Sequence, residues 1–141
     1  MKSEGTILVR NDISELTRLT AFVEQFCAAN QLPPDLEWQL GLALEEVFTN
    51  VVRHGLGGQG DHEIRIEMAR DASEVTLLVE DAGVLFDPLS APPPDIESPL
   101  AERPVGGLGI HLVRQVMDTL IYTRVNDHNR LLMKKHIEEN T

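Results

Sequence analysis

The chain has 141 residues, of which 42% are hydrophobic, so it can form one domain with a substantial core but not two. Its net charge of -11 and its 12 scattered Lys and Arg residues exclude a surface for nucleic-acid backbones, which requires clustered cations. Its single cysteine, Cys27, excludes an intramolecular disulfide, and no run is long enough to span a membrane. We therefore expect one cytoplasmic domain over 1–141, used whole, with protein or small-molecule partners and no contact with membrane or nucleic acid.

The first part of the chain predicts a strand and two helices. Residues 6–10 are a short β-prone run, and Asp12 with Glu15 has the form of a helix N-terminal capping pair. Apolar residues then follow the helical period up to residue 30. A second helix is expected from Pro33-Pro34 to residue 53 or 54, where a run of glycines begins.

The middle of the chain predicts two strands and a long loop. Residues 64–68 alternate as a half-solvated strand, 71–73 form a turn, and 75–79 are more continuously apolar, as in a central strand. Prolines then exclude regular structure over most of 85–105; they are Pro88, Pro92, Pro93, Pro94, Pro99 and Pro104. We predict a functional lid loop at about 85–105, with a disordered tether as the alternative.

After this loop, glycines at 106, 107 and 109 open a third helix with apolar residues at helical spacing. The segments 119–125 and 130–137, around a turn at 126–129, are typical of a closing hairpin. The order is strand, two helices, two strands, loop, helix and two strands. It predicts an α+β fold, a two-layer sandwich with three helices on one face of a mixed, mostly antiparallel sheet.

The second helix carries Glu46, Asn50 and His54 at four-residue spacing, which stacks them along one stripe beside an apolar face. A carboxylate that accepts a proton and an amide oxygen that binds a hard cation, one turn apart, are suited to hold a metal-bound phosphate beside a general base. Asn50 is a poor helix former, which indicates another role for it. A structural histidine is an equally open interpretation of His54.

Two further motifs, considered together with the first, are suited to bind a nucleotide. Asp81, at the end of the central strand, can accept a hydrogen bond from an adenine amine while Gly83 lets the base approach the backbone; a strand-to-turn cap is the alternative. The glycine turn 106–109 presents free amide hydrogens at a helix N-terminus, where phosphate binds; a plain loop-to-helix junction is the alternative.

In this chain order the motifs resemble the ATP-binding domain of the GHKL superfamily, which comprises gyrase, heat-shock-chaperone, histidine-kinase and MutL-type ATPases. More closely, the chain resembles the anti-sigma-factor serine/threonine kinases of the RsbW and SpoIIAB type. The resemblance extends from the first strand to the final hairpin and implies a Bergerat-type fold. It rests on Glu46-x-x-x-Asn50-x-x-x-His54-Gly55, Asp81-x-Gly83 and Gly106-Gly107-Leu108-Gly109-Ile110-x-Leu112-Val113.

The resemblance implies roles for these residues. Glu46 would be the catalytic base, Asn50 would hold Mg²⁺ against the triphosphate of ATP, and Asp81 would bind the adenine amine. Gly83 would allow close stacking of the base, and His54 would lie near the phosphate end or the lid hinge. The remaining nucleotide-binding positions would be Gly106, Gly107, Leu108 and Gly109.

Two departures from the family pattern stand out. Leu85 replaces the second glycine of the usual Asp-x-Gly-x-Gly motif, a form that also occurs in the anti-sigma-like branch. Leu132 is aligned with a threonine of the last strand that helps bind adenine through water. Because leucine lacks this hydroxyl, the replacement affects the expected nucleotide affinity and leaves the expected fold unchanged.

The implied activity is phosphoryl transfer from Mg·ATP to a serine or threonine of a protein. In the related kinases the acceptor is a STAS-domain anti-anti-sigma protein, and phosphorylation frees the kinase to hold a sigma factor in a partner switch. For this chain the sigma-factor arm is left open, as is a homodimer through the first helix and strand. The competing hypothesis is a nucleotide-gated binding module in which ATP orders the loop without transfer, and a third is a structural adaptor with vestigial motifs.

Overall fold

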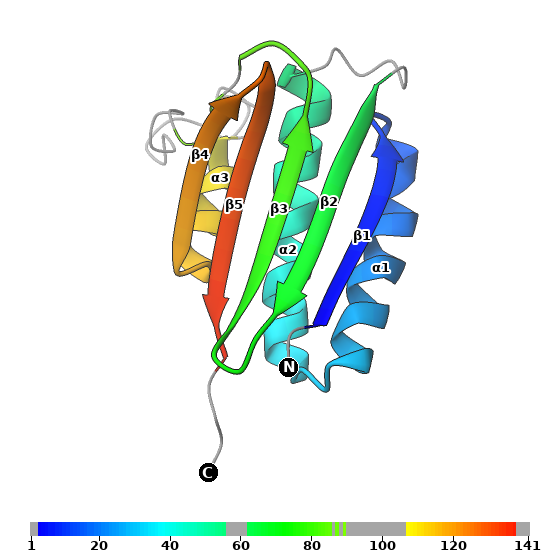
Figure 1. Ribbon diagram of the computed structural model, residues 1–141, viewed down its shortest axis with the longest axis vertical. Coiled ribbons are helices and arrows are strands. Elements are labelled where there is room, and N and C mark those ends of the chain that lie inside the picture. Colours follow the sequence, from blue (N-terminus) through cyan, green and yellow to red (C-terminus); the bar gives the residue numbers. More distant parts are fainter. Residues whose placement is uncertain (1–2, 56–61, 86, 88, 90–106, 138–141) are drawn as a thin grey trace, which may run out of the picture.

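The computed structural model describes residues 3–55, 62–85, 87, 89 and 107–137 (Figure 1). Five strands and three α-helices make up most of this part. In chain order the elements are β1 (Ser3–Arg10), a 3₁₀ turn η1 (Ile13–Glu15), α1 (Leu16–Ala29), α2 (Pro34–Asn50), a π-helical turn η2 (Val51–Gly55), β2 (Glu63–Arg70), β3 (Glu74–Asp81), α3 (Gly107–Val116), β4 (Thr119–Val125) and β5 (His128–His136).

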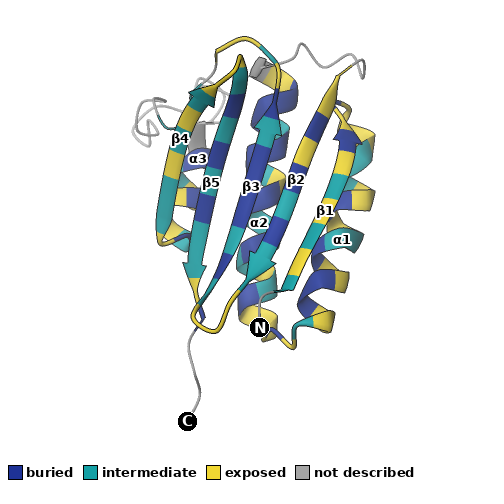
Figure 2. Ribbon diagram, in the orientation of Figure 1, coloured by how far each residue is buried: buried dark blue, intermediate teal, exposed yellow. Residues whose placement is uncertain are grey.

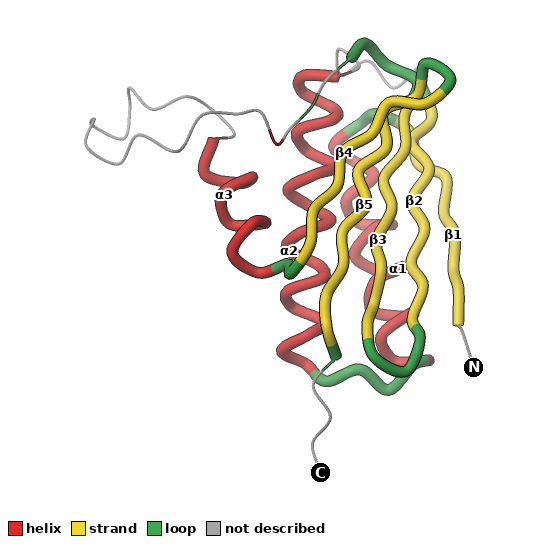
Figure 3. The backbone as a smooth tube through the Cα atoms, turned by 60° about the vertical axis from the view of Figure 1, so that its left-hand side comes forward, coloured by secondary structure: helices red, strands yellow, loops and turns green. Residues whose placement is uncertain are grey.

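The strands form one sheet in the order β1-β2-β3-β5-β4, and the helices cover one of its faces (Figures 1 and 3). The predicted two-layer α+β class and element order are therefore confirmed. All four pairings among the described strands are antiparallel, so this sheet is not mixed. None of the described helices is both long and apolar enough to cross a membrane.

Helix α2 is the centre of the helical layer, between α1 and α3 (Figure 1). Its buried apolar side chains recur at helical spacing: Leu36, Leu40, Ala43, Leu44, Val47 and Phe48. They join one core with the inward side chains of the sheet, among them Ile64, Ile66, Met68, Val75, Leu77 and Val79 (Figure 2). Fully burying each large side chain contributes roughly 1.5–3 kcal/mol, so this face fixes how α2 is rotated about its axis.

Helix α1 packs beside α2 with Leu19, Val23 and Phe26 in the same core. Cys27 is also buried there, and burial, with a smaller contribution from Glu37, raises the pKa of its thiol to about 11. The thiol therefore stays protonated and acts as a small apolar group, as its place in the helical pattern predicted.

The start of the first helix differs in detail from the predicted capping pair. Asp12 accepts a hydrogen bond from the backbone N–H of Ser14 at 2.9 Å, as a cap does. Glu15, however, accepts from the N–H of Arg10 at 2.8 Å and does not reach back to Asp12. The first turn is a 3₁₀ turn, so the α-helix begins only at Leu16.

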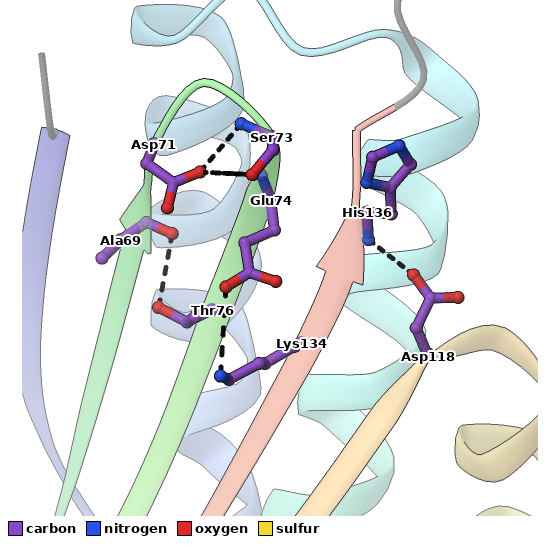
Figure 4. A network of polar contacts seen from close by, with 8 residues as sticks. All are labelled: Ala69, Asp71, Ser73, Glu74, Thr76, Asp118, Lys134 and His136. Carbon is purple, nitrogen blue, oxygen red and sulfur yellow. Dashed lines mark hydrogen bonds and ion pairs between the residues drawn. The ribbon is translucent and has the colours of Figure 1, made fainter.

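Two turns fix the strand registers. Asp71 Oδ1 accepts hydrogen bonds from the N–H groups of Ser73 and Glu74 and from the Ser73 hydroxyl, closing the β2–β3 turn at the end of the sheet drawn in Figure 4. The β4–β5 hairpin turns at Asn126 and Asp127 alone, both with positive φ, as a two-residue type I′ turn requires. The turn predicted at 126–129 is therefore shorter, and residues 128 and 129 belong to β5.

Candidate functional site

Three segments far apart in sequence end at the same end of the molecule. The C-terminal end of α2, the C-terminal end of β3 and the start of α3 all lie at the upper end of the views in Figures 1 and 3. The Asp71 turn lies at the opposite end of β3. The structure thus gathers at one end the elements that carry Glu46, Asn50, Asp81 and Gly107.

Glu46 lies at the margin of the buried face of α2 and is partly exposed. Partial burial raises the pKa of its carboxyl above the ordinary value, the adjacent charge of Glu45 raises it further, and Arg53 opposes the shift. A carboxyl whose pKa is shifted toward neutrality is better suited to accept a proton in a reaction than an ordinary surface glutamate.

Asn50 is the last residue of α2 and is 5% exposed. Its side-chain Nδ2 donates to the backbone carbonyl of Glu46 at 2.8 Å. Because this bond turns the amide nitrogen toward the helix, the amide oxygen is directed away from it. The side chain is therefore oriented to offer an oxygen, which is the ligand type that Mg²⁺ prefers.

The predicted helical stripe does not continue regularly to His54. The α-helix ends at Asn50, and the backbone of 51–55 forms the π-helical turn η2. Such a turn is closed by bonds five residues apart, so the four-residue spacing of Asn50 and His54 no longer sets both on one stripe. The side chain of His54 lies outside the described residues.

Asp81 is 4% exposed and points to the helical face of the sheet, since it alternates in phase with buried Val75, Leu77 and Val79. Its Oδ1 accepts hydrogen bonds from the N–H of Gly83 at 2.9 Å and from Nδ2 of Asn129 at 3.1 Å. The strand-to-turn cap is thus real. Both bonds use Oδ1, so capping leaves Oδ2 as the oxygen for any contact with a ligand.

Asn129 is a residue of this site that sequence reasoning did not single out. It lies opposite Asp81 in register and is 5% exposed. Besides Asp81 it binds the carbonyl of Val84 at 2.8 Å, while its Oδ1 accepts from the Tyr122 hydroxyl and from Arg124. Arg124 also donates to the carbonyl of Gly83 at 3.0 Å. This network, which we call the Asp81 corner, fixes the turn after β3 from the strands beside it.

The glycine turn is described only in part. Gly107 and Gly109 belong to the first turn of α3, so their backbone amides are at the N-terminus of that helix, as predicted. Gly106 lies outside the described residues, as does the side chain of Leu108. Most of the predicted lid at 85–105 also lies outside them. Within its described part, Leu89 packs against the core and its carbonyl accepts from Arg114 of α3.

The position assigned to Leu132 is corrected by the structure. Leu132 alternates with buried Leu131 and Met133 and therefore lies on the face of the sheet away from the helices. It pairs there with Leu78 and Ile121. A side chain on that face does not line a site on the helical side.

Comparison with known proteins agrees with this architecture. The family model described as Histidine kinase-like ATPase domain matches residues 9–135, which include all three helices, the strands β2, β3 and β4, nearly all of β5 and the last two residues of β1. The chain belongs to this family. Use of ATP by this histidine kinase-like ATPase domain follows from the family.

Named relatives include three regulatory proteins. The chain is 27% identical to serine/threonine-protein kinase BtrW of Bordetella bronchiseptica over 82% of the chain and 81% of that protein. It is 26% identical to anti-sigma F factor of Clostridium novyi over 98% and 94%. It is 31% identical to serine-protein kinase RsbW of Bacillus thuringiensis over 74% and 66%. These matches confirm the resemblance and the enzyme class, a protein serine/threonine kinase.

Replacing Glu46 by Gln should reveal its raised pKa as a stability effect. A raised pKa in the folded state means that the ionised carboxyl destabilises the fold. The contribution of Glu46 to the free energy of unfolding is therefore greatest below its unfolded pKa, and it is lost as the pH rises through the folded pKa. At pH 7 the free energy of unfolding of the variant should equal that of wild type or exceed it by up to about 1 kcal/mol. This gain in stability should vanish below about pH 4, where the glutamate of wild type is protonated. Urea titrations across this pH range measure it, with Glu63→Gln on β2 as control; a gain that persists in acid would contradict the assignment.

Replacing Asn129 by Leu should loosen the Asp81 corner. The change leaves the buried Oδ1 of Asp81 and the carbonyl of Val84 each without a hydrogen bond that they now have. We expect a loss of about 1–3 kcal/mol in the free energy of unfolding, measured by urea denaturation. Tyr122→Phe, which removes one bond to Asn129, should cost about 0.5–1.5 kcal/mol. A loss with Asn129→Leu no larger than with Tyr122→Phe would show that the corner is not held by Asn129.

Proposed function

We propose that the protein is a Mg·ATP-dependent serine/threonine kinase and anti-sigma regulatory factor that phosphorylates a STAS-domain anti-anti-sigma protein in a partner switch. The observation that carries the proposal is a pair of residues on α2. Glu46 has a carboxyl with a raised pKa, and Asn50, one turn later, has a buried amide whose nitrogen already donates a hydrogen bond to the Glu46 carbonyl. This pair supplies a general base next to an oxygen ligand. Glu46 lies at the margin of the apolar face that stabilises the fold, and Asn50 is the one polar residue among the buried residues of α2.

Adenine recognition is assigned to the Asp81 corner. An exocyclic amine donates hydrogen bonds, and the buried Asp81 carboxylate has an oxygen not used by its two capping bonds. Gly83, with no side chain, lets the base approach the turn closely. Because Asn129 and Arg124 hold this turn, it needs no reorganisation when a base binds.

Asn50 is the residue that would hold Mg²⁺. The donor set fits the ion, because the side chain is oriented with its amide nitrogen on the Glu46 carbonyl and its oxygen turned away. When bound, Mg·ATP supplies the phosphoryl group and a metal charge that offsets the phosphates. The backbone amides of 106–109 at the start of α3 would bind the phosphate oxygens, with Leu108 and His54 as adjacent positions.

Glu46 would act as the base. It would take the proton of a serine or threonine hydroxyl as the hydroxyl oxygen bonds to the γ-phosphorus and the bond to the β-phosphate oxygen breaks, which gives phosphoprotein and ADP. A raised pKa makes the proton acceptance more favourable than for an ordinary glutamate but requires a pH at which the carboxyl is ionised. The acid limb of the rate profile should therefore lie above the ordinary glutamate pKa.

The names of the relatives support the kinase and anti-sigma parts of the proposal. Two of those compared are named serine or serine/threonine kinases and one is named an anti-sigma factor. A STAS-domain protein as acceptor, a sigma factor as second partner and a homodimer through α1 and β1 belong to the proposal on the strength of this likeness. The single-domain organisation over 1–141, with a lid at about 85–105, is part of the same proposal.

The second candidate is a nucleotide-gated binding module that holds ATP without transferring phosphate. The observation that favours it is the tether between the described start of the loop and α3, where Leu89 accepts from Arg114. Through this bond a nucleotide at the start of α3 would act on the loop without any chemistry. The two candidates differ only in what Glu46 does.

The Glu46→Gln variant separates the two candidates. With γ-labelled ATP and a STAS-domain protein from the same genome, wild type should label the acceptor, and Glu46→Gln should reduce the rate by about 10²–10⁴-fold because the base is lost. The variant should keep its Mg·ATP thermal shift, since glutamine has the same shape. Saturable Mg·ATP binding by wild type with no labelled acceptor would favour the binding module, and no thermal shift at all would favour an adaptor with vestigial motifs.

The Asn50→Ala variant tests the metal assignment. Wild type should show a larger thermal shift with Mg·ATP than with ATP and EDTA, and Asn50→Ala should lose this difference because the oxygen ligand is removed. Thr49→Ala, on the neighbouring position of α2, is the matched control and should keep it. An undiminished Mg²⁺-dependent shift in Asn50→Ala would show that the metal is held elsewhere.

A further inference from the structure

A groove runs between α1 and α2, on the side of α2 away from α3. It encloses about 290 Å³. Its walls come from both helices: Leu16, Leu19, Thr20, Val23 and Glu24 on α1, and Pro34, Glu37, Trp38, Gly41, Leu42, Leu44 and Glu45 on α2. Helix α3 lies on the other side of α2 (Figure 1). None of the residues assigned to ATP lines this groove.

The floor of the groove is apolar and its rim carries an exposed tryptophan. Leu19, Val23 and Leu44 are buried core residues that the groove reaches. Trp38, the only tryptophan of the chain, is 65% exposed at its edge. Single exposed apolar side chains are common on proteins, but tryptophan beside an apolar depression is the typical composition of a protein-binding hot spot.

Gly41 gives an independent indication that something enters the groove. It lies in the interior of α2, where glycine costs about 1 kcal/mol relative to alanine. A Cβ added at Gly41 would meet no atom within 4 Å, and its φ lies outside the positive range that favours glycine. Neither packing nor backbone conformation within this chain requires glycine there. The missing side chain deepens the groove by the volume that a partner's side chain would occupy.

The charge at the rim is of one sign. Glu24, Glu37 and Glu45 line the groove, and no lysine or arginine does. No ion pair found within the described ranges uses any of these three carboxylates. Glu37 has a local role, because it lies in the first turn of α2 where acidic side chains favour the helix dipole. Glu24 and Glu45 have no such role.

We propose that the α1–α2 groove is a docking site for an amphipathic helix of a partner protein that carries apolar residues flanked by lysine or arginine. An apolar stripe fits the floor beside Trp38 and Gly41, and the flanking cations fit the three glutamates. A second copy of this chain is disfavoured as the occupant of this groove, because a two-fold contact through it would bring the same three glutamates against one another. The site goes beyond the kinase reaction, since a partner can be held here while the nucleotide site acts.

The fluorescence of Trp38 tests the proposal directly, because the chain has one tryptophan. The probe is a synthetic helical peptide of about five turns, roughly 18 residues, with leucine on one face and lysine on its flanks. Titration into the full chain, without ATP, should give a saturable blue shift as the indole leaves water. Two peptides are controls: the same pattern with glutamate for lysine, and a scrambled Leu/Lys peptide that has the charge but no apolar face.

Variants then separate the groove from the general acidity of the chain. Gly41→Leu fills the groove where the structure has open space and should weaken peptide binding about tenfold or more, whereas Gly41→Ala should weaken it much less. Glu24→Gln combined with Glu45→Gln should weaken binding and reduce its dependence on salt. The melting temperature of Gly41→Leu should equal or exceed that of wild type, which shows that the fold is intact.

Three results would overturn the proposal. If the scrambled peptide bound as tightly as the amphipathic one, the binding would be non-specific attraction between a basic peptide and an acidic protein. Unchanged affinity in Gly41→Leu would place the peptide elsewhere. Absence of a blue shift with the Leu/Lys peptide would show that the groove takes no basic amphipathic helix. None of these results depends on ATP, so the kinase assignment would be unaffected by them.

Discussion

The burial of one face of α2 against the sheet is the constraint on which the rest of the molecule depends. Leu40, Leu44 and Val47 and their neighbours leave the helix a single rotation about its axis. With that rotation fixed, Glu46 lies at the margin of the core and Asn50 lies at the end of the helix. Apolar packing thus sets the position of the polar groups, and partial burial of the margin alters the chemistry of Glu46.

In the sheet, the position of a buried polar group, Asp81, is likewise set by the residues that surround it. Burying a carboxylate without partners is costly, and here the cost is offset by the N–H of Gly83 and the amide of Asn129. Asn129 is in turn held by Tyr122 and Arg124 from the edge strand β4. The corner is therefore a polar network within an otherwise apolar layer, and its rigidity comes from three strands at once.

Local periodicity was enough to predict the elements, the two-layer class and the position of Glu46 and Asn50 on one stripe. It could not predict contacts that depend on strand register. Asp81 and Asn129 are 48 residues apart, and only the pairing of β3 with β5 sets them opposite each other. Nor could it assign the face of Leu132, because three consecutive apolar residues, 131–133, give no alternation from which a face can be read. The π-helical turn at 51–55 could not be predicted either, because its two valines fit an α-helical pattern equally well.

That widened turn, η2, has a consequence for how the family can vary. A π-helical turn contains one residue more than an α-helical turn. A relative shorter by one residue in this segment would close its helix regularly and keep the same sheet and core. It would nevertheless direct the chain that leaves α2 along another path. Insertion or loss of a single codon here would thus change the exit from α2, next to the proposed nucleotide site, without any change in the architecture beneath it.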